Sequence, residues 1–502
     1  MGHLQDAKRA VASFALDERR LERILFSLFL AAGILIAWKA VSWSTSRDFY
    51  LFQDELGNLA GGRLLTAPYS DILHLFPSWF YNDRPVGLAI ERALYDAFGL
   101  HYASQLLCYL VLHFANCVLA YVLSVRLGID KRLALAGAAV FAGLSTTALT
   151  ATYIGAVFDV ICTLFALGSL VATLQRRHLL SAALFLLALR SKEWAVALPV
   201  LNTLLAIHQN SDWTPRAWLR AGGRLWLQWA LLAVIGVRYL TFLPKMREVV
   251  TASDPYRLVL SFPTFLRSLA YYTGLVFGME EMAGRVPLLV CALLGAVAAY
   301  GLARGRISIW YGVVAYVATL FFVCLLPNIR APYYVYGPQV FLLLALCGVV
   351  QECTWTLIPA VRWRQLALAF VGIAILGQLV AFRCSPYFRD RVLYTQNARR
   401  TCAITAKGAS RLSSMGHGAH VYINNGTSTP YLFTPGPCDY FRVITGTRGI
   451  GCVLDKPESE LLVLYKQDPG EKYWLDYSSS GEVVIRSHEK GPPLRDETRT
   501  SQ

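Results

Sequence analysis

The chain has 502 residues, of which 55% are hydrophobic and only 16% are charged. Its repeated apolar runs, about 17–25 residues long, match the thickness of a bilayer and exclude an ordinary soluble protein. The formal net charge of +15 does not indicate nucleic-acid binding, because the Lys and Arg residues lie mainly in short connections between apolar runs, where they determine membrane topology.

The first apolar run, residues 24–43, follows a basic segment at residues 1–23. A signal peptide would have a shorter run and a small-residue cleavage pattern after it. We therefore expect a first membrane span with a cytoplasmic N-terminal segment. The connection that follows, residues 44–103, is then an outer loop.

The remaining apolar runs predict a transmembrane domain that extends from residue 24 to residue 382. They lie at residues 104–124, 133–153, 156–174, 179–189, 194–207, 225–243, 286–303, 307–326, 335–351 and 365–382. The apolar segment 257–278 contains Arg267, and counting it as a crossing would place the arginines of later connections outside, against the positive-inside bias. We expect this segment to lie along the outer face. The fold class is an α-helical polytopic membrane protein with about 11 transmembrane helices.

Two of these runs are unusually short, 179–189 and 194–207, and are separated by Arg190–Glu193. As one helix they would place three charges near the middle of the membrane, at a cost of about 2.5–3.5 kcal/mol each. As two spans that meet at the outer surface they avoid this cost. The second interpretation also places the basic residues between 216 and 224 in the cytoplasm.

The C-terminal part of the chain differs in character. Residues 383–489 combine a helical pattern at about 386–414 with strand-like stretches such as HVYINN, YFRVITG, ELLVLYK and EVVIRS, which predicts a small extracytoplasmic α/β domain. Cys402, Cys438 and Cys452 could form one disulfide there, and their spacing does not choose the pair. Residues 490–502 predict a disordered tail.

With this topology, the polar clusters that interrupt the spans all reach the outer surface. Asp54 and Glu55 lie in the sequence FQDELGN of the first outer loop, and Asp83 and Arg84 lie in YNDRPVG before an amphipathic stretch. Further candidates come from the ends of later spans: Asp159, Lys192, Glu193, Arg330, Tyr333 and Tyr336. Their convergence predicts an outward-facing site.

Each cluster also has a simpler explanation. Asp54 and Glu55 could belong to a solvated loop, and Asp159 could pair with Lys192 only to offset its burial. Arg330 could contact lipid headgroups, and the tyrosines after it fit an interfacial aromatic belt as well as a sugar-binding wall.

The ordered set of motifs resembles the GT-C superfamily of membrane glycosyltransferases. The set comprises the acidic pair, the Arg-Pro at residues 84–85, YIGAVFD at 153–159, RSKEWAVALP at 190–199 and an Arg followed by a Tyr-rich stretch. It is most similar to the protein O-mannosyltransferase-like branch, including the transmembrane-and-tetratricopeptide O-mannosyltransferases. Two features depart from that pattern: Asp83 stands where a tyrosine usually precedes the Arg-Pro, and a small domain from Cys384 replaces the repeats.

The resemblance implies transfer of a sugar from a polyprenyl-phosphate donor to a hydroxyl of a protein, glycan or lipid acceptor on the extracytoplasmic side. A carboxylate can remove the proton of the attacking hydroxyl, so Asp54 is the candidate general base, with Glu55 orienting it, and a single displacement would invert the anomeric centre. Cations would stabilise the leaving phosphate. The candidates for that role are Arg84, Lys192 and Arg330. Candidate acceptor or sugar contacts are Asp83, Asp159, Glu193, Tyr333 and Tyr336.

Cofactors and alternative functions remain open at this point. The cysteines show no metal-ligand spacing, so no cofactor is required, although the acidic pair could bind Mg²⁺ or Mn²⁺. A polyprenyl-lipid or sugar transporter would place its ionisable groups near the midplane of the membrane and often has two related halves. A non-catalytic envelope scaffold would be insensitive to replacement of Asp54.

Overall fold

The structure is a computed structural model. It describes residues 68–73, 84–99, 101–151, 153–210, 213–249, 257–357, 418–425, 442, 450–453, 456–477 and 483–489. The predicted features at residues 24–43, 365–382 and 386–414, together with Asp54, Glu55 and Asp83, lie outside these residues. Contacts divide the chain into two compact units, whose described parts are 84–87 with 106–357, and 68–73 with 88–105 and 418–489.

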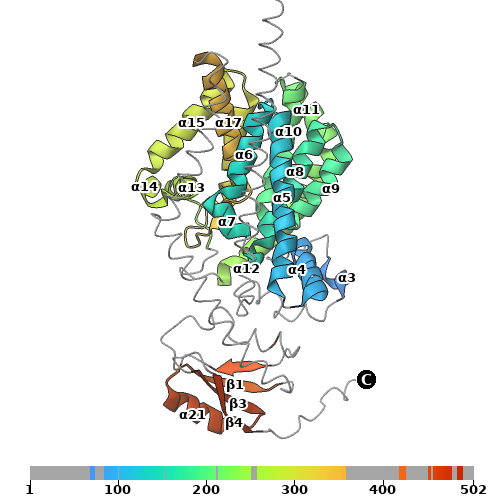
Figure 1. The fold of residues 1–502 in the computed structure, drawn as a ribbon. Helices are drawn as coiled ribbons and strands as arrows, with labels where there is room; N and C mark the ends of the chain where they lie inside the picture. The colour runs from blue at the N-terminus through green and yellow to red at the C-terminus, as the bar shows by residue number, and fades with distance from the viewer. Residues whose placement is uncertain are drawn as a thin grey trace, which may run out of the picture. The chain divides into compact units, whose positions relative to one another are not determined.

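Helices make up almost all of the described chain between residues 69 and 357 (Figure 1). In the first part they are α3 (Tyr69–Ile72), α4 (Pro85–Phe98), α5 (Tyr102–Arg126), α6 (Lys131–Gly143), α7 (Ser145–Ala151), η1 (Ile154–Ala156), α8 (Val157–Leu174), α9 (His178–Leu189), η2 (Glu193–Ala197) and α10 (Leu198–Gln209). They continue with α11 (Pro215–Arg224), α12 (Trp226–Val249), α13 (Phe262–Phe277), α14 (Glu280–Arg285), α15 (Pro287–Ala303), α16 (Ile307–Cys324), η3 (Pro332–Val335) and α17 (Pro338–Leu357).

Several of these helices are long and apolar enough to cross a membrane. Three qualify individually, Ala103–Arg126, Ile154–Leu174 and Ile307–Cys324, and α6 with α7 forms a fourth candidate that bends by 59°. Shorter apolar helices accompany them at His178–Leu189, Trp226–Val237, Pro287–Ala303 and Pro338–Cys353. The predicted class, a polytopic helical membrane protein, is confirmed.

The helix boundaries follow from local sequence signals. Asp130 precedes α6 and accepts a hydrogen bond from the Arg132 amide, and Thr214 caps α11 in the same way through the Ala217 amide, which satisfies donors that a helix leaves free in its first turn. Gly278 ends α13 in the left-handed conformation that favours glycine. These signals place connections where the hydropathy pattern predicts them.

The C-terminal unit contains a four-stranded sheet in the order β2-β1-β3-β4 (Figure 1). Its strands are β1 (His420–Asn425), β2 (Gly451–Val453), β3 (Lys472–Tyr477) and β4 (Val483–Glu489). β1 pairs in parallel with β2 and β3, and β4 pairs antiparallel with β3. The helix α21 (Glu458–Gln467) lies in sequence between β2 and β3. Cys452 on β2 is disulfide-bonded, and Cys402 and Cys438 lie outside the described residues.

The prediction that ELLVLYK forms a strand is wrong, because this stretch lies within α21. Leu461 and Tyr465 are four residues apart and therefore share one helix face. That face packs on Tyr422 and Trp474 of the sheet. A short apolar run does not distinguish a strand from a helix by itself, and here the helical spacing is the one that buries the large side chains.

Candidate functional site

Asp159 and Lys192 form an almost completely buried ion pair. Asp159 lies in the first turn of α8, and Lys192 lies in the turn between α9 and η2. The Lys192 Nζ donates to Asp159 Oδ2 at 2.9 Å, and the two side chains are 6% and 2% exposed. The ammonium group also lies 5.4 Å from the Tyr333 ring and 5.0 Å from the Tyr334 ring. The pairing of Asp159 with Lys192 that the sequence suggests is therefore present.

Arg84 forms a second ion pair in the same region. Its Nε and Nη2 donate to Glu193 Oε1 at 2.9 and 2.8 Å. Burial opposes ionisation of Glu193, but the cations of Arg84 and Lys192 outweigh that effect and lower its pKa. Arg84 therefore remains paired with a carboxylate at neutral pH.

The start of α4 holds Arg84 against the helical bundle. The Arg84 guanidinium lies 5.3 Å from the Phe158 ring, beside Asp159 in the chain. The Val86 amide donates to the Arg190 carbonyl at 3.4 Å. A Cβ at Gly87 would lie 2.2 Å from the Phe158 ring, so a larger residue there would displace that ring. Local backbone contacts thus bring residues more than one hundred positions apart to one place.

Arg330 differs from the other two candidate cations. It lies in the connection between α16 and η3 and is exposed. Its guanidinium lies 4.4 Å from the Tyr271 ring of α13, and the Tyr272 hydroxyl donates to the Ile329 carbonyl next to it at 3.2 Å. Within the described part of the chain, Arg330 forms no salt bridge with an acidic residue. Its charge is therefore available to an anion.

The two predicted tyrosines lie in different environments. Tyr333 contacts Lys192 and the Tyr153 ring, 6.3 Å between centroids. Tyr336 is fully buried, with its hydroxyl 2.7 Å from His113 Nδ1 and accepting from Asn116 Nδ2 at 3.1 Å. The structure therefore brings Arg84, Asp159, Lys192, Glu193 and Tyr333 together and places Tyr336 in a separate internal hydrogen-bonded cluster.

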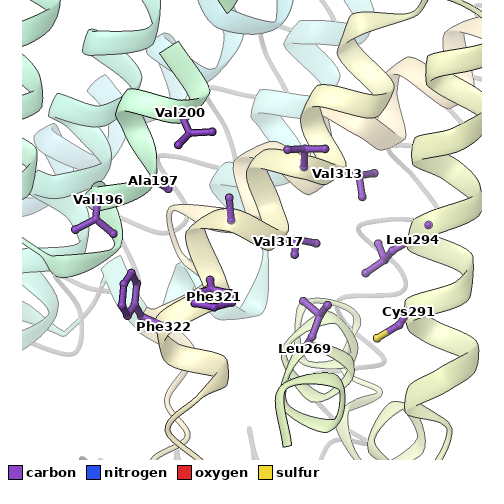
Figure 2. A pocket seen from close by; sticks show the side chains of 13 residues that line it. Val196, Ala197, Val200, Leu269, Cys291, Leu294, Val313, Val317, Phe321 and Phe322 are labelled. Atoms are coloured by element: carbon purple, nitrogen blue, oxygen red, sulfur yellow. The ribbon is translucent and has the colours of Figure 1, made fainter. Parts of the chain in front are cut away.

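An apolar cavity of about 630 Å³ lies beside η2, α10, α13, α15 and α16. Figure 2 shows Val196 and Val200 on one side of it and Leu269, Cys291 and Leu294 on the other. η2 contributes Val196 to this cavity and Glu193 to the ion pair with Arg84. α13 contributes Leu269 to it and Tyr271 to the contact with Arg330. η2 and α13 therefore each contribute both a residue that contacts a candidate cation and part of the lining of the cavity.

The cavity and the contacts of Phe158 were not predicted from the sequence, and Tyr334 was considered only as one of the tyrosines that follow Arg330. No sequence signal marks the cavity, because its lining comes from residues that read as ordinary membrane-span positions. Phe158 precedes the candidate Asp159 in the chain, and this adjacency is the one sequence signal for it. In the described residues, no group of three or more His, Cys, Asp or Glu side chains is placed to hold a metal.

These features define a class: a polytopic helical membrane protein with a cluster of ion pairs and an apolar cavity in its bundle, joined to a small α/β domain. No protein-family model matches the sequence, and no curated protein sequence matches it significantly. Among solved structures, the fold is similar to the crystal structure of ArnT from Cupriavidus metallidurans in the apo state. The TM-score is 0.52 at 11% identity, over 91% of this chain and 93% of that one. This likeness confirms the predicted helical membrane fold, and membership of the GT-C superfamily and of its O-mannosyltransferase-like branch remains a prediction.

Proposed function

We propose that this chain is a membrane glycosyltransferase that moves a sugar from a polyprenyl-phosphate donor to an acceptor hydroxyl on the extracytoplasmic face. The observation that carries the proposal is Arg330, an exposed arginine with no acidic partner among the described residues. Its guanidinium contacts Tyr271 of α13, a helix that also lines the apolar cavity. The phosphate of a polyprenyl-phosphate donor would bind Arg330, and its hydrocarbon chain would occupy the cavity. The GT-C-like fold supports the same class of enzyme.

The three candidate cations have different roles in this proposal. Arg84 and Lys192 are already neutralised by Glu193 and Asp159, so we assign them to positioning. Arg330 is assigned to the donor phosphate, since a guanidinium matches phosphate oxygens in a bidentate geometry. As negative charge grows on the leaving phosphate, this contact strengthens and lowers the barrier.

The apolar cavity suits the first isoprene units of the carrier. Its lining contains only apolar residues, glycine and a cysteine, so an isoprenoid gains the hydrophobic contribution of burial without leaving polar groups unpaired. Cavities of about 300–1,000 Å³ are typical of sites for ligands of this size. The rest of the chain would stay in the lipid phase.

Asp54 is the proposed general base, with Glu55 orienting it, and both lie outside the described residues. An acceptor hydroxyl becomes nucleophilic as its proton passes to a carboxylate within hydrogen-bond reach. With no second carboxylate acting as nucleophile, the C1–O bond to the phosphate breaks as the new C1–O bond forms, and the configuration inverts. The O-mannosyltransferase-like choice of sugar and acceptor follows only from the sequence resemblance.

The test is transfer by the purified full chain, reconstituted in lipid nanodiscs, from a panel of radiolabelled polyprenyl-phosphate sugars. The acceptors offered are a second panel of peptide, glycan and lipid alcohols. We expect the radiolabelled sugar of one donor to be transferred to one of these acceptors. Asp54→Asn should abolish turnover while leaving donor binding intact. Translocation of intact donor without cleavage would instead identify a transporter, and no reaction with any donor would contradict the proposal.

A further inference from the structure

The amphipathic helix α11 lies at the end of the bundle opposite the ion pairs. α8 starts near Asp159 and ends at Leu174 after 18 residues, a rise of about 27 Å. α9 returns to Lys192, and η2 with α10 crosses again to the connection that enters α11. One crossing, by η2 with α10, therefore separates Lys192 from α11 and places α11 at the opposite end of the bundle.

The residues of α11 divide among three faces. Successive residues of a helix are rotated by about 100°. Ala217, Ala221 and the following Leu225 are buried and form the face that packs on the bundle. The exposed remainder divides into a basic face and an apolar face.

The basic face consists of Arg216, Arg220 and Arg224, which are four residues apart and all exposed. The apolar face carries Trp218 and Leu219, which are 41% and 77% exposed. A helix with one buried, one charged and one exposed apolar face fits the boundary between lipid and water, because each face then meets its preferred surroundings.

Neighbouring tryptophans extend the apolar face and hold the helix in place. Trp226, immediately after α11, is 62% exposed. Trp213, immediately before it, lies 5.5 Å from the Trp310 ring of α16 and 6.4 Å from Trp218. Tryptophan is enriched at membrane interfaces, so these rings mark the level of the headgroups.

Two arginines of α11, Arg216 and Arg224, differ from others at the same end of the bundle. Arg304 and Arg306 pair with Glu352 at 3.1 and 2.6 Å. Arg216 and Arg224 form no salt bridge with any acidic residue that the structure describes. Their positive charge is therefore not compensated locally and is complementary to an anion.

We propose that α11 lies in the membrane interface and binds the phosphate groups of anionic phospholipids through Arg216, Arg220 and Arg224. Guanidinium groups bind phosphate oxygens in a bidentate geometry, and each basic side chain near an anionic leaflet adds to membrane affinity. This surface is separate from the donor site and does not depend on the glycosyltransferase proposal.

The test compares lipid binding by the full chain and by the Arg216→Gln/Arg220→Gln/Arg224→Gln variant. Detergent-purified protein is titrated with dioleoylphosphatidylglycerol or dioleoylphosphatidylcholine, and bound lipid is counted by native mass spectrometry. The wild type should prefer the anionic lipid, and the variant should lose about tenfold or more of that preference. The same three changes to lysine should retain most of it.

A matched control replaces Arg257, Arg267 and Arg285 with glutamine. These arginines are also exposed but belong to the segment around α13 and α14, so the control loses the same charge and should keep the preference. An equal loss in both variants would overturn the proposal in favour of a general charge effect. If the α11 variant does not fold, a wild-type preference that is unchanged between low and high salt would also overturn it.

Discussion

The Asp159–Lys192 pair makes each charge dependent on the other, because both side chains are removed from solvent. Lys192→Met leaves a buried carboxylate without its counter-charge, and we expect a loss of about 3–5 kcal/mol in the free energy of unfolding. Denaturant titration in mixed micelles measures this change in the free energy of unfolding. Replacing both residues with apolar ones should recover most of the loss.

Lys456 provides the matched control for this prediction. Its pair with Glu460 is exposed, with side chains 39% and 50% accessible, so Lys456→Met should cost about 1 kcal/mol or less. Equal losses in the two variants would show that burial does not govern the Lys192 pair.

Arg330 is the residue on which the donor-binding prediction depends. Arg330→Gln removes a charged contact to phosphate, worth about 1.5–3 kcal/mol, and should raise the donor Kd by about 10–100-fold. Arg330→Lys keeps the charge but loses the bidentate geometry, so its effect should be smaller. Isothermal titration with a non-transferable donor analogue measures both. Arg285→Gln, at another exposed arginine, should leave Kd unchanged.

Part of the candidate site could be predicted from the sequence. The Asp159–Lys192 pair was predictable because two opposite charges next to membrane spans must offset each other. The Arg84–Glu193 pair was not, since it depends on how the start of α4 docks against the bundle. The burial of Tyr336 was not predictable either, because a Tyr-rich run after a span fits an interfacial belt equally well.

The helices α16 and α17 approach each other closely at Gly312. A Cβ there would lie 2.7 Å from the Phe341 carbonyl oxygen and 2.8 Å from the Ala345 amide nitrogen. Because both neighbours are backbone atoms, Gly312→Ala must push the helices apart, at a cost of about 1–3 kcal/mol. Thermal unfolding should show a lower Tm.

The control for Gly312 is Gly236 in α12, where a Cβ would meet nothing within 4 Å. Gly236→Ala should be neutral or stabilising by about 0.5–1 kcal/mol, because alanine loses less backbone entropy in a helix. A Gly312→Ala variant as stable as this control would contradict the close packing of α16 and α17.

The C-terminal sheet should lose stability in acid because of Asp468. Burial opposes ionisation of this carboxylate, but hydrogen bonds from the Gly470 amide and the Tyr422 hydroxyl, both at 2.9 Å, help to lower its pKa. His420 Nδ1, 2.6 Å from the same carboxylate, also contributes. A pKa that is lower in the folded state contributes stability above the unfolded value of about 3.9, and this is lost as the pH falls through the folded value.

Hydrogen exchange of the β1 amides in the full chain measures this effect. We expect their protection to decrease below about pH 4. Asp468→Asn should weaken protection at neutral pH and make it less sensitive to acid. The same acid sensitivity in the wild type and the variant would show that other carboxylates are responsible.

At the scale of elements, helix positions were more predictable than the small domain. Helices α5, α8 and α16 begin and end within a few residues of the predicted spans, because a bilayer requires long apolar runs and charged residues interrupt them. The strand β3 was not predicted, and helix α21 was predicted as a strand. A small α/β domain is specified by short runs whose conformation depends on what they pack against.

At the scale of the whole molecule, the two ends of the helical bundle differ in charge. The end reached by the connections after α5, α8, α10 and α15 carries mainly arginines and lysines, with Asp130 and Glu352 as described acidic residues. The other end carries the paired charges of Arg84, Lys192 and their partners. An excess of Lys and Arg in short connections marks the cytoplasmic side.

This asymmetry predicts the orientation of the chain in the membrane. An epitope inserted at Gly305, in the α15–α16 connection, should bind antibody only in inside-out vesicles. An epitope at Glu281, in α14, should bind only in right-side-out vesicles, because α13 and α14 precede a single crossing by α15. Detergent-opened vesicles control for epitope exposure. The reverse pattern would place the ion pairs and Arg330 on the cytoplasmic side, and the donor phosphate would then have to be bound at the inner leaflet.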